Sequence, residues 1–235
     1  KMQWTLRIKK VEEIYQKKEF KVLDVGTGPG TFLKVASDLG HDAQGLDLSP
    51  AAVNFVKMKG YKSSLINLGE NDGFEEGYFD FIHASEVLEH LYEPELIVKR
   101  ITEILKPNGI VCFSVPNDFS IIQHYANKVV SNEKRYWWVD TKHHLNYFNQ
   151  NSLSKLMRNF GLNDIFFMNT FPLDLFLLMG KNYVDNPSLG RDCHLMRQNF
   201  EKLFFETDSI ENLIKFYCKL STDGFGRHIV AFGRK

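Results

Sequence analysis

The chain has no excess of charge, few cysteines and no long apolar run. Its 29 Lys and Arg residues balance 29 Asp and Glu residues, so no global field attracts a nucleic-acid backbone or an anionic bilayer, and neither is an expected partner. Three widely separated cysteines, Cys112, Cys193 and Cys218, exclude a disulfide framework and a cysteine zinc site. The most apolar window, residues 165–180, is interrupted by polar residues and is shorter than the roughly 20 residues that cross a bilayer. We therefore expect a cytoplasmic protein without a transmembrane segment.

What the chain does contain is an alternation of strand and helix patterns. Short β-rich runs alternate with helical stretches, which is typical of an α/β fold with a mostly parallel sheet covered by helices on both faces. Up to Pro116 the expected strands are 20–25, 43–47, 64–67, 78–84 and 110–115, and the expected helices are 4–15, 31–39, 50–59 and 94–105. Beyond it we expect helix 152–160, strand 165–168, a helical region over 174–220 and a last strand at 228–232, whereas 117–146 shows no clear period.

We expect a single domain over residues 1–235. Its recognisable core spans about 20–116, two cap segments span about 117–149 and 171–225, and the last strand spans about 227–233. Aromatic residues form 14% of the chain, and 20 of them follow Pro116. The aromatic excess therefore belongs to the cap and the C-terminal half.

A glycine loop follows the first expected strand. Asp24 to Gly30 read Asp-Val-Gly-Thr-Gly-Pro-Gly, and a loop of this kind before a helix gathers backbone N–H groups where a negatively charged ligand group can sit. The third glycine comes one residue too early for a dinucleotide fingerprint, and the lysine of a nucleotide-binding P-loop is absent. The alternative is plain strand-to-helix packing, since glycine also serves tight turns.

The loop and Asp47, which ends the second expected strand, resemble the first two motifs of class I S-adenosylmethionine-dependent methyltransferases. Four further phrases are similar to the same family: YFDFIHASEVLEHL at 78–91, LKPNG at 105–109, SVPN at 114–117 and HHLNYF at 143–148. The last two point to the subgroup that resembles ubiquinone-biosynthesis O-methyltransferases (methyltransferase types 11, 12 and 23). The resemblance implies a Rossmann-like, seven-stranded fold, with S-adenosylmethionine as cofactor and S-adenosylhomocysteine as product.

The resemblance also implies the cofactor-binding residues. Asp47 would hold the ribose hydroxyls, because a carboxylate accepts two hydrogen bonds from a vicinal diol; its alternative role is to help cap the next helix. The acid that often follows the third strand of the family is replaced here by Asn67 and Leu68, so the adenine contacts depart from the family pattern. The expected set is Asp24, Gly26, Thr27, Gly28, Gly30, Asp47, Leu48, Asn67, Leu68, Ala84 and Ser85.

Three histidines are the candidate catalytic residues. Methyl transfer requires the acceptor to be placed in line with the methyl group, and a general base helps when the acceptor is a hydroxyl. His90 follows the fourth expected strand, and His143 and His144 belong to a segment that should fold over it. Histidine can take a proton at neutral pH; the alternative is that each is a polar histidine with no role in proton transfer.

The Glu86-x-x-Glu89-His90 phrase raises the question of a divalent metal. On a helical turn these three side chains would share one face, and two carboxylates with an imidazole can bind one ion, to which His143 or His144 can add a further ligand. In ubiquinone-type O-methyltransferases and in small-RNA 2′-O-methyltransferases a similar phrase is associated with a metal. We do not favour a metal here, because the glutamates can equally cap or pair on the surface.

The cap should hold the acceptor. A small basic cluster, Arg191, His194 and Arg197, can meet a phosphate or form a solvated helix face. Because the aromatic residues concentrate here, we expect them to exclude water from the transferred methyl group and to favour an uncharged or partly apolar acceptor. We expect O-methylation of a small-molecule or sugar-linked hydroxyl; the alternatives are a small-molecule N-methyltransferase and a non-catalytic S-adenosylmethionine- or nucleotide-binding module.

Overall fold

A seven-stranded sheet of order β3-β2-β1-β4-β5-β7-β6 organises the protein. The computed structural model describes residues 1–70, 72–130, 136–184 and 186–235. Neighbouring strands from β3 to β5 pair in parallel, and β7 runs antiparallel to both β5 and β6. The predicted α/β fold is thereby confirmed. The strands are β1 Lys21–Val25, β2 Asp42–Asp47, β3 Lys62–Leu65, β4 Phe79–Ser85, β5 Leu105–Pro116, β6 Asn163–Phe167 and β7 His228–Arg234.

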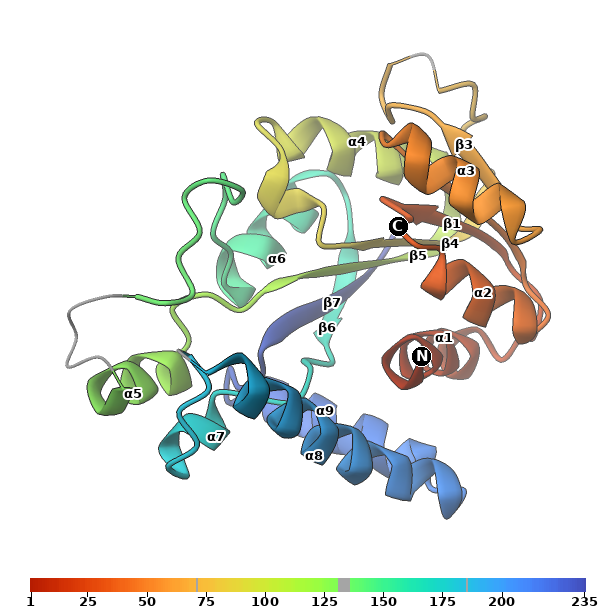
Figure 1. The fold of residues 1–235 in the computed structure, drawn as a ribbon. Coiled ribbons are helices and arrows are strands. Elements are labelled where there is room, and N and C mark those ends of the chain that lie inside the picture. Colours follow the sequence, from red (N-terminus) through yellow and green to blue (C-terminus); the bar gives the residue numbers. More distant parts are fainter. Residues whose placement is uncertain (71, 131–135, 185) are drawn as a thin grey trace.

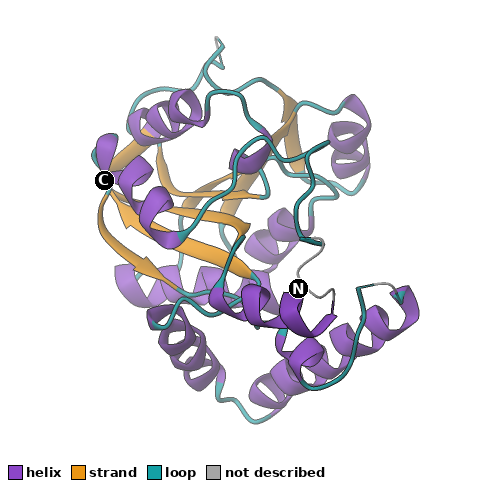
Figure 2. Ribbon diagram, turned by 90° about the vertical axis from the view of Figure 1, so that its left-hand side faces the viewer, coloured by secondary structure: helices purple, strands orange, loops and turns teal. Residues whose placement is uncertain are grey.

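Helices cover both faces of this sheet (Figures 1 and 2). On one face, buried side chains of α1 (Met2–Tyr15), α2 (Thr31–Asp38), α3 (Pro50–Met58) and α9 (Ile210–Thr222) form one apolar cluster with the strands. On the other face, α4 (Pro94–Ile104) and α6 (Gln150–Asn159) contribute to a second cluster. The remaining helices are α5 (Ile121–Val130), α7 (Leu175–Leu178) and α8 (Pro187–Glu206), and a 3-10 turn, η1, covers Leu88–His90.

The sequence explains why the central strands lie where they do. In β4, Phe81 packs with the first cluster while Ile82 and Ala84 pack with the second. A strand that is apolar on both faces fits only a sheet covered on both sides.

Helix α3 begins at the expected signal: the Ser49 hydroxyl accepts a hydrogen bond from the Ala52 amide (3.3 Å) at its start.

Four expected elements differ from the structure. The strand expected at 110–115 begins five residues earlier, as β5 Leu105–Pro116. The weak strand at 64–67 is instead β3 Lys62–Leu65, set by its parallel pairing with β2 residues 44–47. The helical region over 174–220 is divided into α7, α8 and α9, because Asn186 and Pro187 begin a new helix and Asp208 takes a left-handed φ of 49°. The stretch 117–146, which shows no clear period, contains α5.

Across the described ranges, no helix is both long and apolar enough to cross a bilayer.

Gly45 of β2 generates a prediction about stability. A Cβ atom at this position would lie 2.3 Å from Thr27 Oγ1 and 2.7 Å from Leu33 Cδ1, so β2 can approach the glycine loop only without a side chain. We expect Gly45→Ala to lower the free energy of unfolding by about 1–3 kcal/mol through overpacking, measured by urea denaturation.

Gly190 is the matched control. It lies inside α8, where an added Cβ would meet nothing nearer than Tyr183 Cβ at 3.9 Å, so Gly190→Ala should be neutral or stabilise by up to about 1 kcal/mol. If both variants unfold at the wild-type urea concentration, the close approach of β2 to the loop does not constrain this position.

Candidate functional site

The glycine loop lies at the carboxyl end of β1, between the ends of β2 and β4. Gly26, Gly28 and Gly30 all have left-handed φ values, between 48° and 72°. A Cβ on Gly26 would lie 2.6 Å from Val87 and a Cβ on Gly30 would lie 2.8 Å from Val56, whereas the space beside Gly28 is open. Two of these glycines therefore bring the loop close to its neighbours, and the third leaves room for a ligand.

Asp47 is fixed in position at the edge of this loop. Its Oδ2 accepts from the Gly28 amide and its Oδ1 from the Ser49 amide, both at 2.8 Å. Each carboxylate oxygen keeps a second lone pair, and the side chain is only half-buried. The open space at Gly28 and the two available acceptor sites fit a vicinal diol such as a ribose.

The other expected cofactor residues gather at the same edge of the sheet. Leu48, directly after β2, is 63% exposed, and Asn67 and Leu68 follow β3 with Asn67 exposed and Leu68 buried. Ala84, near the end of β4, is buried, whereas Ser85 is partly exposed and accepts a hydrogen bond from Arg7 (3.3 Å). An exposed apolar side chain beside Asp47 suits contact with a flat ring.

A buried relay of polar side chains links the glycine loop to α1. The Thr27 hydroxyl donates to Asp24 Oδ2 (2.7 Å), and the other carboxylate oxygen lies 2.8 Å from His83 Nδ1. On the far side of the ring, His83 Nε2 lies 2.8 Å from Arg7 Nη1, and Arg7 Nη2 donates to Ser114 Oγ (3.0 Å). Asp24, His83 and Arg7 are each at most 3% exposed, so the relay is sealed from solvent.

The relay fixes the protonation state of His83. A guanidinium group can only donate, so Nε2 of His83 accepts from Arg7 and Nδ1 donates to Asp24, as in a neutral imidazole. Burial also lowers the pKa of His83, which agrees with a neutral ring. Phe32 stacks on this ring with centroids 3.8 Å apart.

The candidate catalytic residues meet at η1. His90 Nδ1 donates to the main-chain carbonyl of His143 (2.7 Å), which leaves Nε2 of His90 as an acceptor. The amides of Leu145 and Asn146 donate to the Glu89 carbonyl at 2.7 and 3.0 Å, which ties the segment around His143 onto η1. The expectation that this segment folds over His90 is met by the backbone.

The imidazoles of the three histidines do not all converge. The rings of His90 and His144 lie 5.1 Å apart, whereas the His143 side chain is 70% exposed and lies 2.8 Å from Asp140. His143 therefore contributes its main-chain carbonyl to the contact with His90, while its ring lies against Asp140.

The prediction that Glu86, Glu89 and His90 share a helical face is wrong. Glu86 has a left-handed φ of 56° and precedes η1, and its carboxylate lies 3.6 Å from His228 Nε2. Instead, potential ligand atoms of Glu89, His90 and His144 lie within 4.8 Å of one another. The Glu89 carboxylate is fully buried and both its oxygens lack a hydrogen-bond partner; burial, with Glu86 nearby, raises its pKa to about 8.

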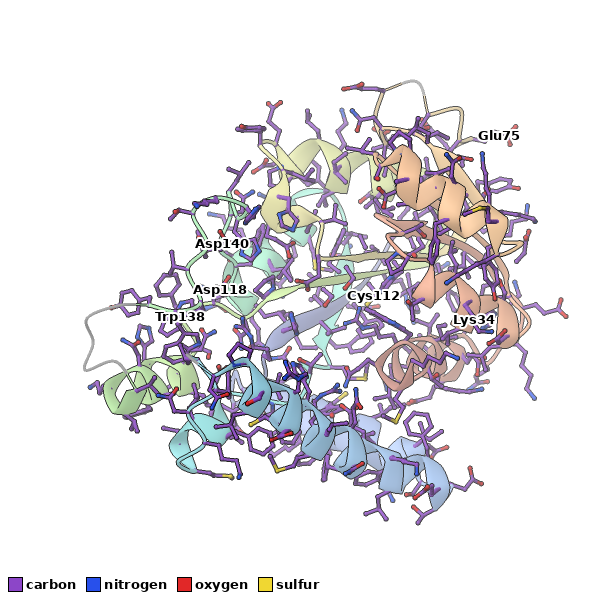
Figure 3. All side chains as sticks on the ribbon, in the orientation of Figure 1. Lys34, Glu75, Cys112, Asp118, Trp138 and Asp140 are labelled. Carbon is purple, nitrogen blue, oxygen red and sulfur yellow. The ribbon has the colours of Figure 1, made fainter. Side chains whose placement is uncertain are left out.

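The structure adds residues that no sequence motif indicated. Asp118, just after β5, is 3% exposed with neither carboxylate oxygen partnered, and burial raises its pKa to about 6. Figure 3 shows Asp118 beyond the end of β5, on the same side as Trp138 and Asp140. For His83 a signal existed, because it is a polar residue within the buried apolar run of β4; Arg7 lies between the buried residues Leu6 and Ile8, in a stretch that also contains lysines.

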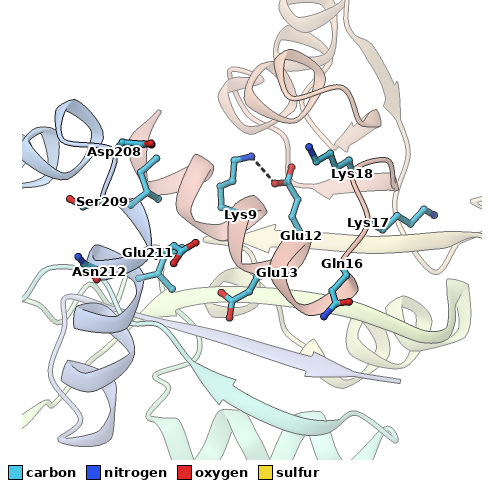
Figure 4. A pocket seen from close by; sticks show the side chains of 12 residues that line it. Lys9, Glu12, Glu13, Gln16, Lys17, Lys18, Asp208, Ser209, Glu211 and Asn212 are labelled. Atoms are coloured by element: carbon cyan, nitrogen blue, oxygen red, sulfur yellow. Dashed lines mark hydrogen bonds and ion pairs between the residues drawn. The ribbon is translucent and has the colours of Figure 1, made fainter.

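Two cavities bear on where a ligand binds. The larger, about 750 Å³, lies between the end of α1 and the start of α9 and is lined by solvated, paired charges such as Lys9 and Glu12 (Figure 4). It shares no described residue with the candidate site. The smaller, about 310 Å³, is lined by Arg7, Ser85 and Glu86 and therefore adjoins the end of β4.

The chain is similar in sequence to known proteins. The family model described as methyltransferase domain matches residues 3–165. A ubiquinone biosynthesis O-methyltransferase of Thiobacillus denitrificans is 32% identical over 103 residues, which cover 41% of this chain and 44% of that protein. The chain thus spans less than half the length of this curated relative.

Solved structures share the fold. A SAM-dependent methyltransferase from Archaeoglobus fulgidus has a TM-score of 0.62 at 18% identity, covering 100% of this chain and 95% of that chain. A phosphoethanolamine N-methyltransferase of Haemonchus contortus, solved with S-adenosyl-L-methionine, has a TM-score of 0.56 at 18% identity, covering 97% of this chain and 52% of that chain. The fold implied by the sequence resemblance is confirmed.

The relay around His83 generates a second prediction. His83→Phe preserves a ring that can stack on Phe32 but leaves the buried charges of Asp24 and Arg7 without their link, so we expect a loss of about 3 kcal/mol or more in the free energy of unfolding. Below pH 6.5 the unfolded chain protonates His83 while the folded protein resists protonation. Wild-type stability should therefore fall as the pH drops from 7 to 5, and more steeply than that of the variant.

His124 provides the control for this measurement. It is an exposed histidine on α5, so His124→Phe should change neither stability nor its pH slope appreciably. Identical urea midpoints for His83→Phe and wild type would show that the relay adds nothing to stability.

Proposed function

The chain belongs to the methyltransferase domain family, whose cofactor is S-adenosylmethionine, and we propose that it methylates a hydroxyl oxygen of a small-molecule acceptor. The observation that carries the proposal is an orientated base, His90, on the η1 turn, whose preceding residue Val87 lies against Gly26 of the glycine loop. The cap segments 117–149 and 171–225 would hold the acceptor.

The cofactor residues follow from the geometry of the loop. Asp47, already held by two amides, would accept hydrogen bonds from the ribose hydroxyls of the cofactor. The open space at Gly28 would leave room for the neighbouring part of the cofactor. When bound, S-adenosylmethionine supplies an electrophilic methyl group and leaves as S-adenosylhomocysteine. The relay from Thr27 through Asp24 to His83 holds the loop in place for this binding.

The chain's own contribution to the chemistry is placement and proton removal. With Nδ1 of His90 donating to the His143 carbonyl, the lone pair on Nε2 is available to take the proton of the acceptor hydroxyl. The carbonyl would also stabilise the imidazolium that forms. His144, with its ring 5.1 Å from that of His90, would help to position the acceptor.

One observation favours a second role for the group formed by Glu89, His90 and His144. The buried, unpartnered carboxylate of Glu89 lies with ring nitrogens of His90 and His144 in a group of metal-ligand dimensions. These three residues would hold a divalent ion, which would polarise the acceptor hydroxyl in place of a general base. Chelation separates the two roles.

Asp47 generates a prediction about cofactor binding. Asp47→Asn replaces one acceptor oxygen by an NH2 group that faces a backbone amide, so the affinity for S-adenosylmethionine should fall about tenfold or more. Isothermal titration calorimetry measures this. The control is Asp42→Asn at the other end of β2, where the exposed Asp42 pairs with Lys62 (2.7 Å); its affinity should match the wild type. Unchanged affinity of Asp47→Asn would contradict the ribose assignment.

The histidines generate a prediction about turnover. His90→Gln should lower turnover about 100-fold or more while leaving S-adenosylmethionine affinity within about twofold, with S-adenosylhomocysteine release followed on hydroxylated aromatics and nucleotide sugars. His143→Gln is the matched control, because its side chain lies outside the cluster. A His90→Gln enzyme with wild-type turnover would argue for N-methylation, which needs no base.

Removal of metal ions tests the metal role separately from the base. If an ion is required, turnover should be lost after exhaustive treatment with EDTA and restored by Mg²⁺ or Mn²⁺, and Glu89→Gln should abolish the restoration. Full turnover in EDTA, with no ion found by elemental analysis of the purified protein, leaves His90 as a base.

A further inference from the structure

The cavity of about 310 Å³ lies between α1, α8 and the start of β7. Its lining includes Ser85 and Ser114, which lie near the carboxyl ends of β4 and β5. In the sheet order, β4 and β5 lie on the side of β1 that is opposite to β2. The glycine loop therefore separates the cavity from Asp47 and the expected ribose. The acceptor should approach from the cavity side.

Two arginines line this cavity with unpartnered donors. Arg7 is 3% exposed; its two terminal nitrogens are hydrogen-bonded, but its Nε atom is buried without a partner. Nη1 of Arg227 is likewise buried and unpartnered. Buried donors in folded proteins are normally satisfied. Both side chains line the cavity, where a bound anion would meet two positively charged groups.

The cap helix α8 adds a third arginine on the same wall. Arg197 Nη1 donates to Glu201 Oε2 (2.6 Å), and Glu201 is fully buried behind it and also accepts from the Tyr217 hydroxyl (2.6 Å). This pairing holds the Arg197 side chain in place before any ligand arrives. A fixed, planar guanidinium suits recognition of a carboxylate or phosphate.

The charges on the wall favour an anion. Three arginines, Arg7, Arg197 and Arg227, line the cavity together with a single carboxylate, Glu86. His228 lies among them, and burial followed by the charges of Arg227, Arg7 and Arg197 lowers its pKa to about 3. Glu201 does not line the cavity, and Asp24 reaches Arg7 only through the neutral ring of His83.

We propose that this cavity binds a carboxylate or phosphate group of the methyl acceptor, which Arg227 and Arg197 recognise. The inference rests on the proposed methyltransferase function and narrows its substrate class to anionic small molecules. It replaces the expectation of a neutral, ring-lined pocket, because the aromatic side chains of the C-terminal half mostly pack with each other and with the sheet.

Titration with inorganic phosphate tests the cavity directly. Phosphate should bind the wild-type protein in calorimetry at constant ionic strength, and Arg227→Gln should raise the dissociation constant about tenfold or more, since a charged hydrogen bond is lost. Arg191→Gln on α8 is the matched control, because Arg191 is exposed and does not line the cavity. No phosphate binding by the wild type, or equal binding by both variants, would overturn the proposal.

A second arm separates the acceptor from the carboxylate of the cofactor. Phosphate should bind equally well to protein saturated with S-adenosylmethionine. If the cofactor instead excludes phosphate, and Arg227→Gln weakens binding of S-adenosylmethionine but not of 5′-methylthioadenosine, which lacks the carboxylate, the assignment to the acceptor is wrong. Failure of the proposed function would look different: the wild type would not bind S-adenosylmethionine, while the phosphate titration would be unaffected.

A turnover arm tests the substrate class. Hydroxylated aromatic acids and sugar phosphates should be methylated in preference to the matching amides and unphosphorylated sugars. Arg227→Gln should raise KM for the anionic acceptors about tenfold with a smaller change in kcat, and Arg191→Gln should leave both unchanged. Equal rates on the anionic and neutral members of each pair would overturn the proposal.

Discussion

The hydrogen bond between Asp24 and His83 is the contact on which the candidate site depends. On one side, Asp24 holds Thr27 and with it the start of the glycine loop; on the other, His83 accepts from Arg7 and so docks α1 against the sheet. A single imidazole therefore separates two opposite buried charges and holds each in a fixed position. Because buried charges are tolerated only when they are paired and hydrogen-bonded, the loop, β4 and α1 must assemble together.

This arrangement divides the site into two halves with different chemistry. The half at β1 and β2 consists of backbone amides, glycines and Asp47, which suit a polar, uncharged ribose. The half at β5, β7 and α8 consists of guanidinium groups with buried donors. Ser85 and Glu86, at the end of β4, lie between the halves.

The sequence predicted those parts of the protein that depend on neighbouring residues in the chain. The order of strands and helices, the glycine loop and Asp47 follow from local patterns, because a strand, a glycine turn and a helix cap are each specified within a few residues. The two contacts of the Arg7–His83–Asp24 relay join residues that are 76 and 59 positions apart in the chain, and no local pattern specifies such contacts. The metal-ligand geometry expected for Glu86 failed for a different reason: it assumed a helical turn where the backbone takes a left-handed φ.

The placement of β7 has a consequence for the order in which the protein assembles. β7 inserts between β5 and β6, although about 60 residues separate it from β6 in the chain. Contacts between distant segments form late, because a long loop must first close. Strands β1 to β4, which carry the glycine loop and Asp47, are joined by short connections and can form earlier. Since Arg227 directly precedes β7 and His228 begins it, the proposed anion-binding cavity would be completed last, and a folding intermediate without β7 would hold the cofactor half of the site while lacking the means to choose an acceptor.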